Sequence, residues 1–168
     1  MARWIMTLAL LCLVPPAALA ATPVTKEVAH AYYGNCKARQ DPRMTPESQD
    51  ALCACTAAKM QESMTVEDIQ TMSRNDAAGR AALNHMLVNI YGPCMEYPVQ
   101  DLVAAQCASD TKIDMMNLKN DRVTLCTCMG KRTGQWFGTK GTALIARLLK
   151  ANPNITDPIG PVMDSAEF

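Results

Sequence analysis

A doubled cysteine spacing constrains the fold of this chain more than any other feature of its sequence. In the first copy, sixteen residues separate Cys36 from a Cys-x-Cys pair at positions 53 and 55. In the second copy, eighteen residues separate Cys107 from a Cys-x-Cys pair at positions 126 and 128. A repeated cysteine spacing indicates a repeated structural unit held together by disulfides. The pattern therefore predicts how the chain is built, and it says much less about what the chain does.

The first 20 residues have the pattern of a secretory signal peptide. Arg3 supplies the positive charge, an apolar run extends from Ile5 to Val14, and Ala18-Leu19-Ala20 supplies a small-x-small cleavage signal. The apolar run is too short to span a bilayer as a helix, which takes roughly 20 residues. We expect cleavage near Ala20-Ala21 and a periplasmic or secreted mature protein, in a compartment where disulfides persist.

The composition and the periodicity favour helices over strands. Aromatic residues make up 5% of the chain, and no segment alternates strictly between apolar and polar residues. The clearest helix precedes Gly92, where apolar residues recur at the spacing i, i+3, i+4, i+7 (Leu83, Met86, Leu87 and Ile90). Thr45-Pro46 and Thr65 with Asp68 are typical helix starts. Together these signals predict helices over about 24–36, 46–63, 76–91, 98–108, 117–130 and 141–151, with a short helix from position 65.

We therefore predict an all-α fold, a disulfide-stabilised helical bundle of about six to seven helices built from two related Cys-x-Cys helical hairpins. The domain is expected to cover residues 21–151, with repeat units at about 24–94 and 98–151. The tail at 152–168 contains three prolines and is expected to be irregular.

Helix geometry limits how the cysteines of the first unit can pair. Residues two apart on a helix point roughly 200° away from each other, so Cys53 and Cys55 should not bond to one another. Two connectivities remain open: Cys36–Cys53 with Cys55–Cys94, or Cys36–Cys55 with Cys53–Cys94. Either one closes a hairpin loop, which stabilises the fold by about 3 kcal/mol.

The second unit contains only Cys107, Cys126 and Cys128, so one thiol is left without a partner. By the same geometry the unpaired residue is Cys126 or Cys128. It is either a buried and inert cysteine, or a reactive thiol, or the site of a disulfide-linked homodimer.

The sequence lacks the patterns of the common enzyme and nucleic-acid-binding classes. Lys and Arg together number 16, as do Asp and Glu, and this balance argues against a nucleic-acid partner. Neither a Cys-x-x-Cys redox motif nor a phosphate-binding glycine motif is present. The two histidines, His30 and His85, are expected to face solvent and have no recognisable catalytic neighbours. We therefore expect a protein that is not an enzyme and needs no cofactor.

One stretch suggests a binding surface. Between Val123 and Thr156 there is no acidic residue, and the stretch contains an aromatic pair among glycines and cations. A glycine-rich loop of this kind suits an acidic partner, such as another periplasmic or envelope protein. The residues proposed for this contact are Lys131, Arg132, Trp136, Phe137 and Lys140. In the alternative interpretation, the two aromatic rings plug the core between the units.

The leading hypothesis is thus an exported, non-enzymatic structural or protein–protein interaction module. One alternative is a copper(I)-handling protein that uses Cys126, Cys128 and Met129, because soft thiolate and thioether ligands favour Cu(I). Methionines at helical spacing are more often core residues, and an oxidising compartment consumes thiolates. Another alternative is lipid binding in the manner of saposin-like helical disulfide domains.

Overall fold

The computed structural model describes residues 21–114 and 121–165, and within them the chain is all-α and disulfide-bonded. The described residues form no strand, and a single isolated bridge pairs Pro23 with Thr65. The predicted fold class is confirmed, whereas the relatedness of the two hairpins stays a prediction. The predicted signal peptide at 1–20 lies outside the described residues.

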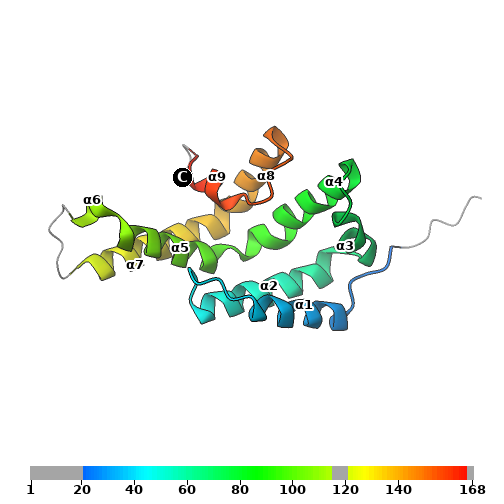
Figure 1. Ribbon diagram of the computed structural model, residues 1–168, viewed down its shortest axis with the longest axis horizontal. Coiled ribbons are helices and arrows are strands. Elements are labelled where there is room, and N and C mark those ends of the chain that lie inside the picture. Colours follow the sequence, from blue (N-terminus) through cyan, green and yellow to red (C-terminus); the bar gives the residue numbers. More distant parts are fainter. Residues whose placement is uncertain (1–20, 115–120, 166–168) are drawn as a thin grey trace, which may run out of the picture.

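Helices α1 (Lys26–Ala38) and α2 (Pro46–Ser63) form the first hairpin along one long edge of the molecule (Figure 1). The N-terminus of α2 is capped as the sequence predicts: the Thr45 hydroxyl accepts a hydrogen bond from the backbone N–H of Ser48 at 3.2 Å. Pro46 occupies the first helical position, where a backbone N–H would have no partner within the helix. The N–H that proline lacks therefore costs no hydrogen bond.

The chain then turns back through two short helices. Helix α3 (Val66–Met72) starts with the predicted capping box, in which the Thr65 hydroxyl accepts from the N–H of Asp68 and the Asp68 carboxylate accepts from the N–H of Thr65. Helix α4 (Ala77–His85) is capped by Asp76, whose carboxylate accepts from the N–H of Gly79. Both starts depend on local side-chain chemistry, which explains why the sequence reveals them.

From α4 the chain continues through the middle of the molecule without leaving helical conformation (Figure 1). A π-helical segment, η1 (Met86–Tyr91), is followed by a 3₁₀ turn, η2 (Gly92–Cys94), and by helix α5 (Glu96–Ser109). The predicted helix over 76–91 ends where expected, because α4 and η1 together stop at Tyr91, directly before Gly92. Pro93 lies in the first positions of the new turn η2, where its missing N–H and fixed φ are tolerated.

The second hairpin pairs α5 with α7 (Arg122–Trp136), and the short helix α6 (Thr111–Asp114) follows α5. Glycines four residues apart bring the two backbones close together: a Cβ atom added at Gly134 would lie 2.5 Å from the carbonyl oxygen of Glu96. The helix predicted at 117–130 is α7, which starts later, at Arg122, and extends further, to Trp136. Residues 115–120 lie outside the described part.

The glycine-rich loop predicted around 130–141 does not exist. Helix α7 includes Gly130 and Gly134 and runs directly into a second π-helical segment, η3 (Phe137–Gly141). Glycine usually marks a break, but here the missing side chain makes room for α5. Tertiary packing therefore overrides the local preference.

The chain closes over the centre of the molecule with α8 (Thr142–Ala151) and a last short helix, α9 (Ile159–Met163) (Figure 1). The tail expected to be irregular thus contains a helix. Val162 of α9 is fully buried in the main core, and this burial explains why α9 packs against the rest of the molecule despite the prolines of the tail.

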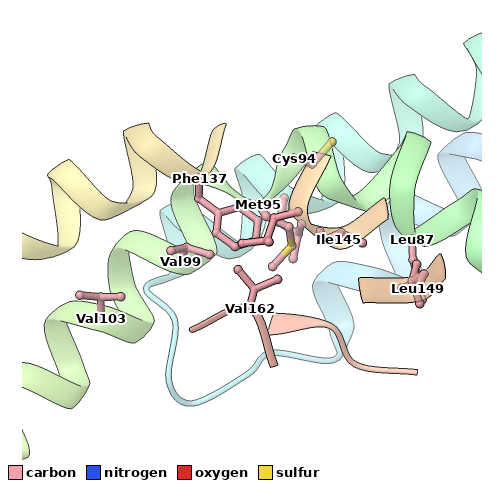
Figure 2. Close-up of a cluster of buried hydrophobic side chains, with 11 residues drawn as sticks. Leu87, Cys94, Met95, Val99, Val103, Phe137, Ile145, Leu149 and Val162 are labelled. Atoms are coloured by element: carbon pink, nitrogen blue, oxygen red, sulfur yellow. The ribbon is translucent and has the colours of Figure 1, made fainter. Parts of the chain in front are cut away.

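The main core lies where the second hairpin, η1 and the returning helices meet (Figure 2). Phe137 is fully buried at its centre, among Met95, Val99 and Ile145. A second cluster between α1, α2 and η1 is rich in methionine, including Met60, Met64 and Met86. Flexible, unbranched methionine side chains fill irregular gaps, which is their role here.

Candidate functional site

The disulfides fix how the helices lie relative to one another. Of the two connectivities left open for the first unit, the structure has Cys36–Cys53 and Cys55–Cys94. The first bond joins α1 to α2 and the second joins α2 to η2. In the second unit a bond joins Cys107 of α5 to Cys126 of α7.

The two bonds of the first unit join elements around an apolar cleft, which lies between the first hairpin and the middle of the molecule. The cleft has a volume of about 410 Å³. One wall is Leu52 of α2 with the connection 39–45, and the floor is formed by η1 and α5. The far rim is the segment 156–159 before and at the start of α9. The lining side chains are mainly aliphatic, among them Met44, Leu52, Leu83, Leu87, Met95 and Leu102.

A second and more polar chamber of about 470 Å³ adjoins the apolar cleft. The two chambers share four lining residues, which are Asp41, Met44, Leu52 and Tyr91. The polar chamber adds Asn35 and Arg39 from the end of α1, together with Tyr32 and Gln49. An apolar cavity and a polar cavity therefore meet along one common wall.

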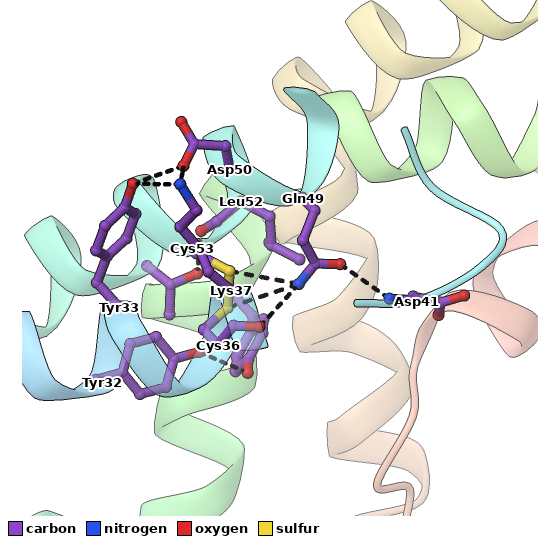
Figure 3. The surroundings of a disulfide bond; sticks show 11 residues. Tyr32, Tyr33, Cys36, Lys37, Asp41, Gln49, Asp50, Leu52 and Cys53 are labelled. Atoms are coloured by element: carbon purple, nitrogen blue, oxygen red, sulfur yellow. Dashed lines mark hydrogen bonds and ion pairs between the residues drawn. A yellow bond between two sulfur atoms is a disulfide. The ribbon is translucent and has the colours of Figure 1, made fainter. Parts of the chain in front are cut away.

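Gln49 holds in place the wall that the two chambers share (Figure 3). Its side chain is buried, and its Nε2 donates to the carbonyl oxygen of Cys36 at 3.2 Å and lies 3.4 Å from the sulfur of Cys53. Its Oε1 accepts from the backbone N–H of Asp41 at 3.3 Å. One amide thus ties the connection between α1 and α2 to the first disulfide, so that the connection keeps a defined shape beside the cleft.

The mouth of the cleft carries an ion pair. The Arg43 guanidinium donates to both carboxylate oxygens of Asp41, with the shortest distance at 2.6 Å. These bonds and the one from the Arg43 backbone lower the pKa of Asp41 to about 2. The negative charge of Asp157 acts on Arg43 from the opposite rim.

A tyrosine pair connects the wall of the polar chamber to η1. The hydroxyls of Tyr32 and Tyr91 lie 2.9 Å apart. Burial, followed by the hydrogen bond with Tyr91, raises the pKa of Tyr32, so the Tyr32 hydroxyl stays protonated at neutral pH. The π-helical geometry of η1 brings Tyr91 to both chambers, together with Met86 and Leu87 of the apolar one. Such π-helical turns are frequent at functional sites.

The residues proposed for contact with an acidic partner do not form one surface. Phe137 is fully buried and Trp136 packs partly buried against the main core, which matches the alternative interpretation of the aromatic pair. Lys131, Arg132 and Lys140 are exposed. Docking of an acidic protein on these three cations stays a prediction.

The three residues proposed as copper ligands are separated by their bonding. The sulfur of Cys126 is bonded to Cys107, so it offers no thiolate in the oxidised protein. Cys128 has an exposed free thiol, so of the three alternatives for the unpaired cysteine the buried, inert one is wrong. The Met129 sulfur lies 3.9 Å from that of Cys107. Within the described residues no cluster of three or more His, Cys, Asp or Glu side chains is placed to hold a metal ion.

His30 and His85 are both exposed, as predicted, and neither lines the apolar cleft or the polar chamber. In the described ranges 21–114 and 121–165, no helix is both long enough and apolar enough to cross a membrane.

No protein-family model matches this sequence, and neither a curated protein nor a solved structure is detectably similar to it. The site therefore has to be judged by its own geometry.

Sequence reasoning missed most of the cleft. Its residues come from segments far apart in the chain, from Asp41 to Ile159, and none of them forms a motif. Two local signals stand at its mouth, the turns Asp41-Pro42-Arg43 and Asp157-Pro158. In the second turn the Asp157 carboxylate accepts from the N–H of Ile159 at 3.1 Å and starts α9. These turns predict chain reversals, but no local signal reveals that the two reversals face each other.

Proposed function

We propose that this protein is exported, is not an enzyme, and binds the apolar part of a small ligand in the cleft between the first hairpin and η1. The observation that carries the proposal is the cleft itself. Its volume of about 410 Å³ falls in the range of small-molecule sites, which is roughly 300–1,000 Å³. Its largely aliphatic lining favours transfer of an apolar group from water by about 25 cal/mol for each Å² buried.

The disulfides support the proposal in two ways. Three bonds in one small chain suit an oxidising compartment, in agreement with the signal-peptide pattern at 1–20. Cys36–Cys53 and Cys55–Cys94 also join the elements that line the cleft, so the cavity exists before a ligand arrives. A preformed site avoids the entropy loss of ordering its walls during binding.

The side chains around the cleft support binding over catalysis. Both histidines lie elsewhere, and the Asp41 carboxylate is already engaged by Arg43. A general base needs a pKa near the working pH, whereas the pKa of Asp41 is held at about 2. Asp41 therefore suits an electrostatic role at the mouth.

The test is direct binding of a neutral, apolar fluorophore to the oxidised mature protein. N-phenyl-1-naphthylamine should bind with increased emission, and dodecanol should displace it. Leu102→Trp introduces an indole ring into the cleft and should weaken binding of the fluorophore at least tenfold. Leu125→Trp adds the same ring to a half-buried leucine of α7 outside the cleft and should leave binding unchanged.

Thermal unfolding monitored by circular dichroism must show that both variants fold. Ligand at one hundred times its Kd should also raise the stability of the wild-type protein by about 2.7 kcal/mol. Absence of binding by both the fluorophore and dodecanol, or equal binding by Leu102→Trp and the wild type, would contradict the proposal.

A further inference from the structure

The polar chamber next to the cleft indicates which head group the ligand carries. Because both chambers are lined by Asp41, Met44, Leu52 and Tyr91, they adjoin, and a ligand that occupied both would extend across these four residues. Such a ligand has an aliphatic tail for the apolar cleft and a compact polar group for the other chamber. The remaining question, which rests on the proposed function, is the charge of that polar group.

Most polar groups of the second chamber are already hydrogen-bonded within the protein. The Gln49 amide is used by Cys36 and by Asp41, and the hydroxyls of Tyr32 and Tyr91 bond to each other. Asp41 is held by Arg43 through both of its carboxylate oxygens. These groups shape the chamber but leave few bonds for a ligand.

Arg39 is different. It follows α1 directly and is one of the residues that line the polar chamber. Among the described residues, no carboxylate lies within ion-pair distance of its guanidinium. Since the charges of Asp41 and Arg43 offset each other, the polar chamber carries one uncompensated positive charge. A guanidinium presents paired N–H donors, which match the two oxygens of a carboxylate.

We propose that the ligand is the anion of a medium-chain fatty acid, with its aliphatic tail in the apolar cleft and its carboxylate beside Arg39. Asn35, at the end of α1 in the same chamber, supplies an amide donor near the head group. The second carboxylate of the cleft mouth, Asp157, lies at the rim of the apolar chamber and not in the polar one. The two rims thus differ in charge, and this difference orients the ligand.

The test compares three ligands that share one tail: dodecanoate, dodecanol and dodecylamine, each displacing N-phenyl-1-naphthylamine from the oxidised protein. Dodecanoate should bind about fivefold more tightly than dodecanol, which is the upper end of the gain in affinity that a solvent-exposed ion pair gives. Dodecylamine should bind more weakly than dodecanol. The advantage of dodecanoate should shrink as the salt concentration rises, because salt screens exposed charges.

Arg39→Gln should remove the dodecanoate advantage and leave dodecanol binding within twofold of the wild type. Arg80→Gln on α4, outside both chambers, removes the same charge and should change neither affinity. Both positions are at least partly exposed, so folding is expected to be retained and is checked by thermal unfolding.

The outcomes separate this inference from the proposed function. If dodecanol binds in the cleft but dodecanoate binds no more tightly, or keeps its advantage in Arg39→Gln, the head-group assignment is wrong while the apolar site stands. If no ligand binds, the proposed function itself fails. Binding to phosphatidylglycerol vesicles without binding of free dodecanoate would identify a membrane surface as the source of the anion and would overturn the assignment to a free fatty acid.

Discussion

At the scale of single residues, the close contact between α5 and α7 depends on positions that carry no side chain. Gly130 and Gly134 face α5, where an added Cβ would meet the backbone of Gln100 in the first case and of Glu96 in the second. Gly138 follows at the same spacing, beside the Glu96 carboxylate. The backbones of α5 and α7 approach closely because these positions carry no side chain.

Gly134→Ala should therefore destabilise the protein by about 2 kcal/mol, as overpacking at a rigid contact does. Gly34→Ala is the matched control, because Gly34 lies within α1 and an added Cβ there has no neighbour within 4 Å. It should stabilise the protein by about 0.5–1 kcal/mol through helix propensity alone. Urea denaturation of both variants measures the change in the free energy of unfolding. Equal changes in the same direction for Gly134→Ala and Gly34→Ala would rule out the packing explanation.

The sequence revealed the cysteines as helix-linking residues but not these glycines. Cys-x-Cys on a helix excludes internal pairing by geometry alone, and this argument needs no knowledge of the neighbours. Glycine is ambiguous, since it marks breaks in most sequences and close contacts in a few. Only the position of α5 decides between the two meanings, and α5 starts 38 residues before Gly134.

At the scale of elements, the connection between α1 and α2 is held at each of its ends. Gln49 bonds to the backbone of Asp41, and the Asp101 carboxylate of α5 accepts from both the N–H and the hydroxyl of Thr45 at 2.8 Å. The Asp41–Arg43 pair fixes the turn between them. This connection forms one side of both chambers, so its order bears directly on ligand binding.

Acid should loosen this connection. The pKa of Asp41 is lowered from an ordinary 3.8 to about 2 by its hydrogen bonds with Arg43, so the folded state binds a proton less readily than the unfolded chain. The Asp41–Arg43 pair therefore makes its full contribution to the free energy of unfolding above about pH 4. That contribution is lost as the pH falls from about 4 to 2. The stability difference between wild type and Asp41→Asn should shrink over this range. A carboxyl titration of Asp41 by NMR with a midpoint near 4 would contradict the assignment.

Elements with local signals were predictable, and elements made by packing were not. The caps at Thr45 and Thr65 lie within four residues of their partners, and α2 and α3 start where the sequence indicates. The π-helical segments η1 and η3 have no such signal, and the Asp157-Pro158 turn before α9 predicts a chain reversal but not a helix. Each of them places a large buried side chain, Ile90, Phe137 or Val162, into a core built from distant segments.

At the scale of the whole molecule, the three disulfides contribute unequally because they close loops of different length. Cys55–Cys94 spans a sequence separation of 39, against 19 for Cys107–Cys126. Loop-closure entropy predicts that Cys55→Ser with Cys94→Ser costs about 4 kcal/mol and that Cys107→Ser with Cys126→Ser costs about 3 kcal/mol. Urea denaturation of the two double variants measures the difference.

Mass spectrometry after alkylation of the unreduced mature protein checks the bond pattern itself. Only Cys128 should be labelled, since it carries the free thiol. The predicted homodimer, joined through Cys128, would instead appear as a doubled mass that collapses on reduction. A label on any other cysteine would contradict the connectivity.

The bond pattern also decides how the molecule responds to a protease. A cut between Cys36 and Cys53, or between Cys55 and Cys94, leaves the two products covalently joined. A cut within α5 between Cys94 and Cys107 parts them, because no disulfide bridges that stretch. The backbone of α5 is therefore the only covalent link between the part of the chain held by Cys36–Cys53 and Cys55–Cys94 and the part held by Cys107–Cys126.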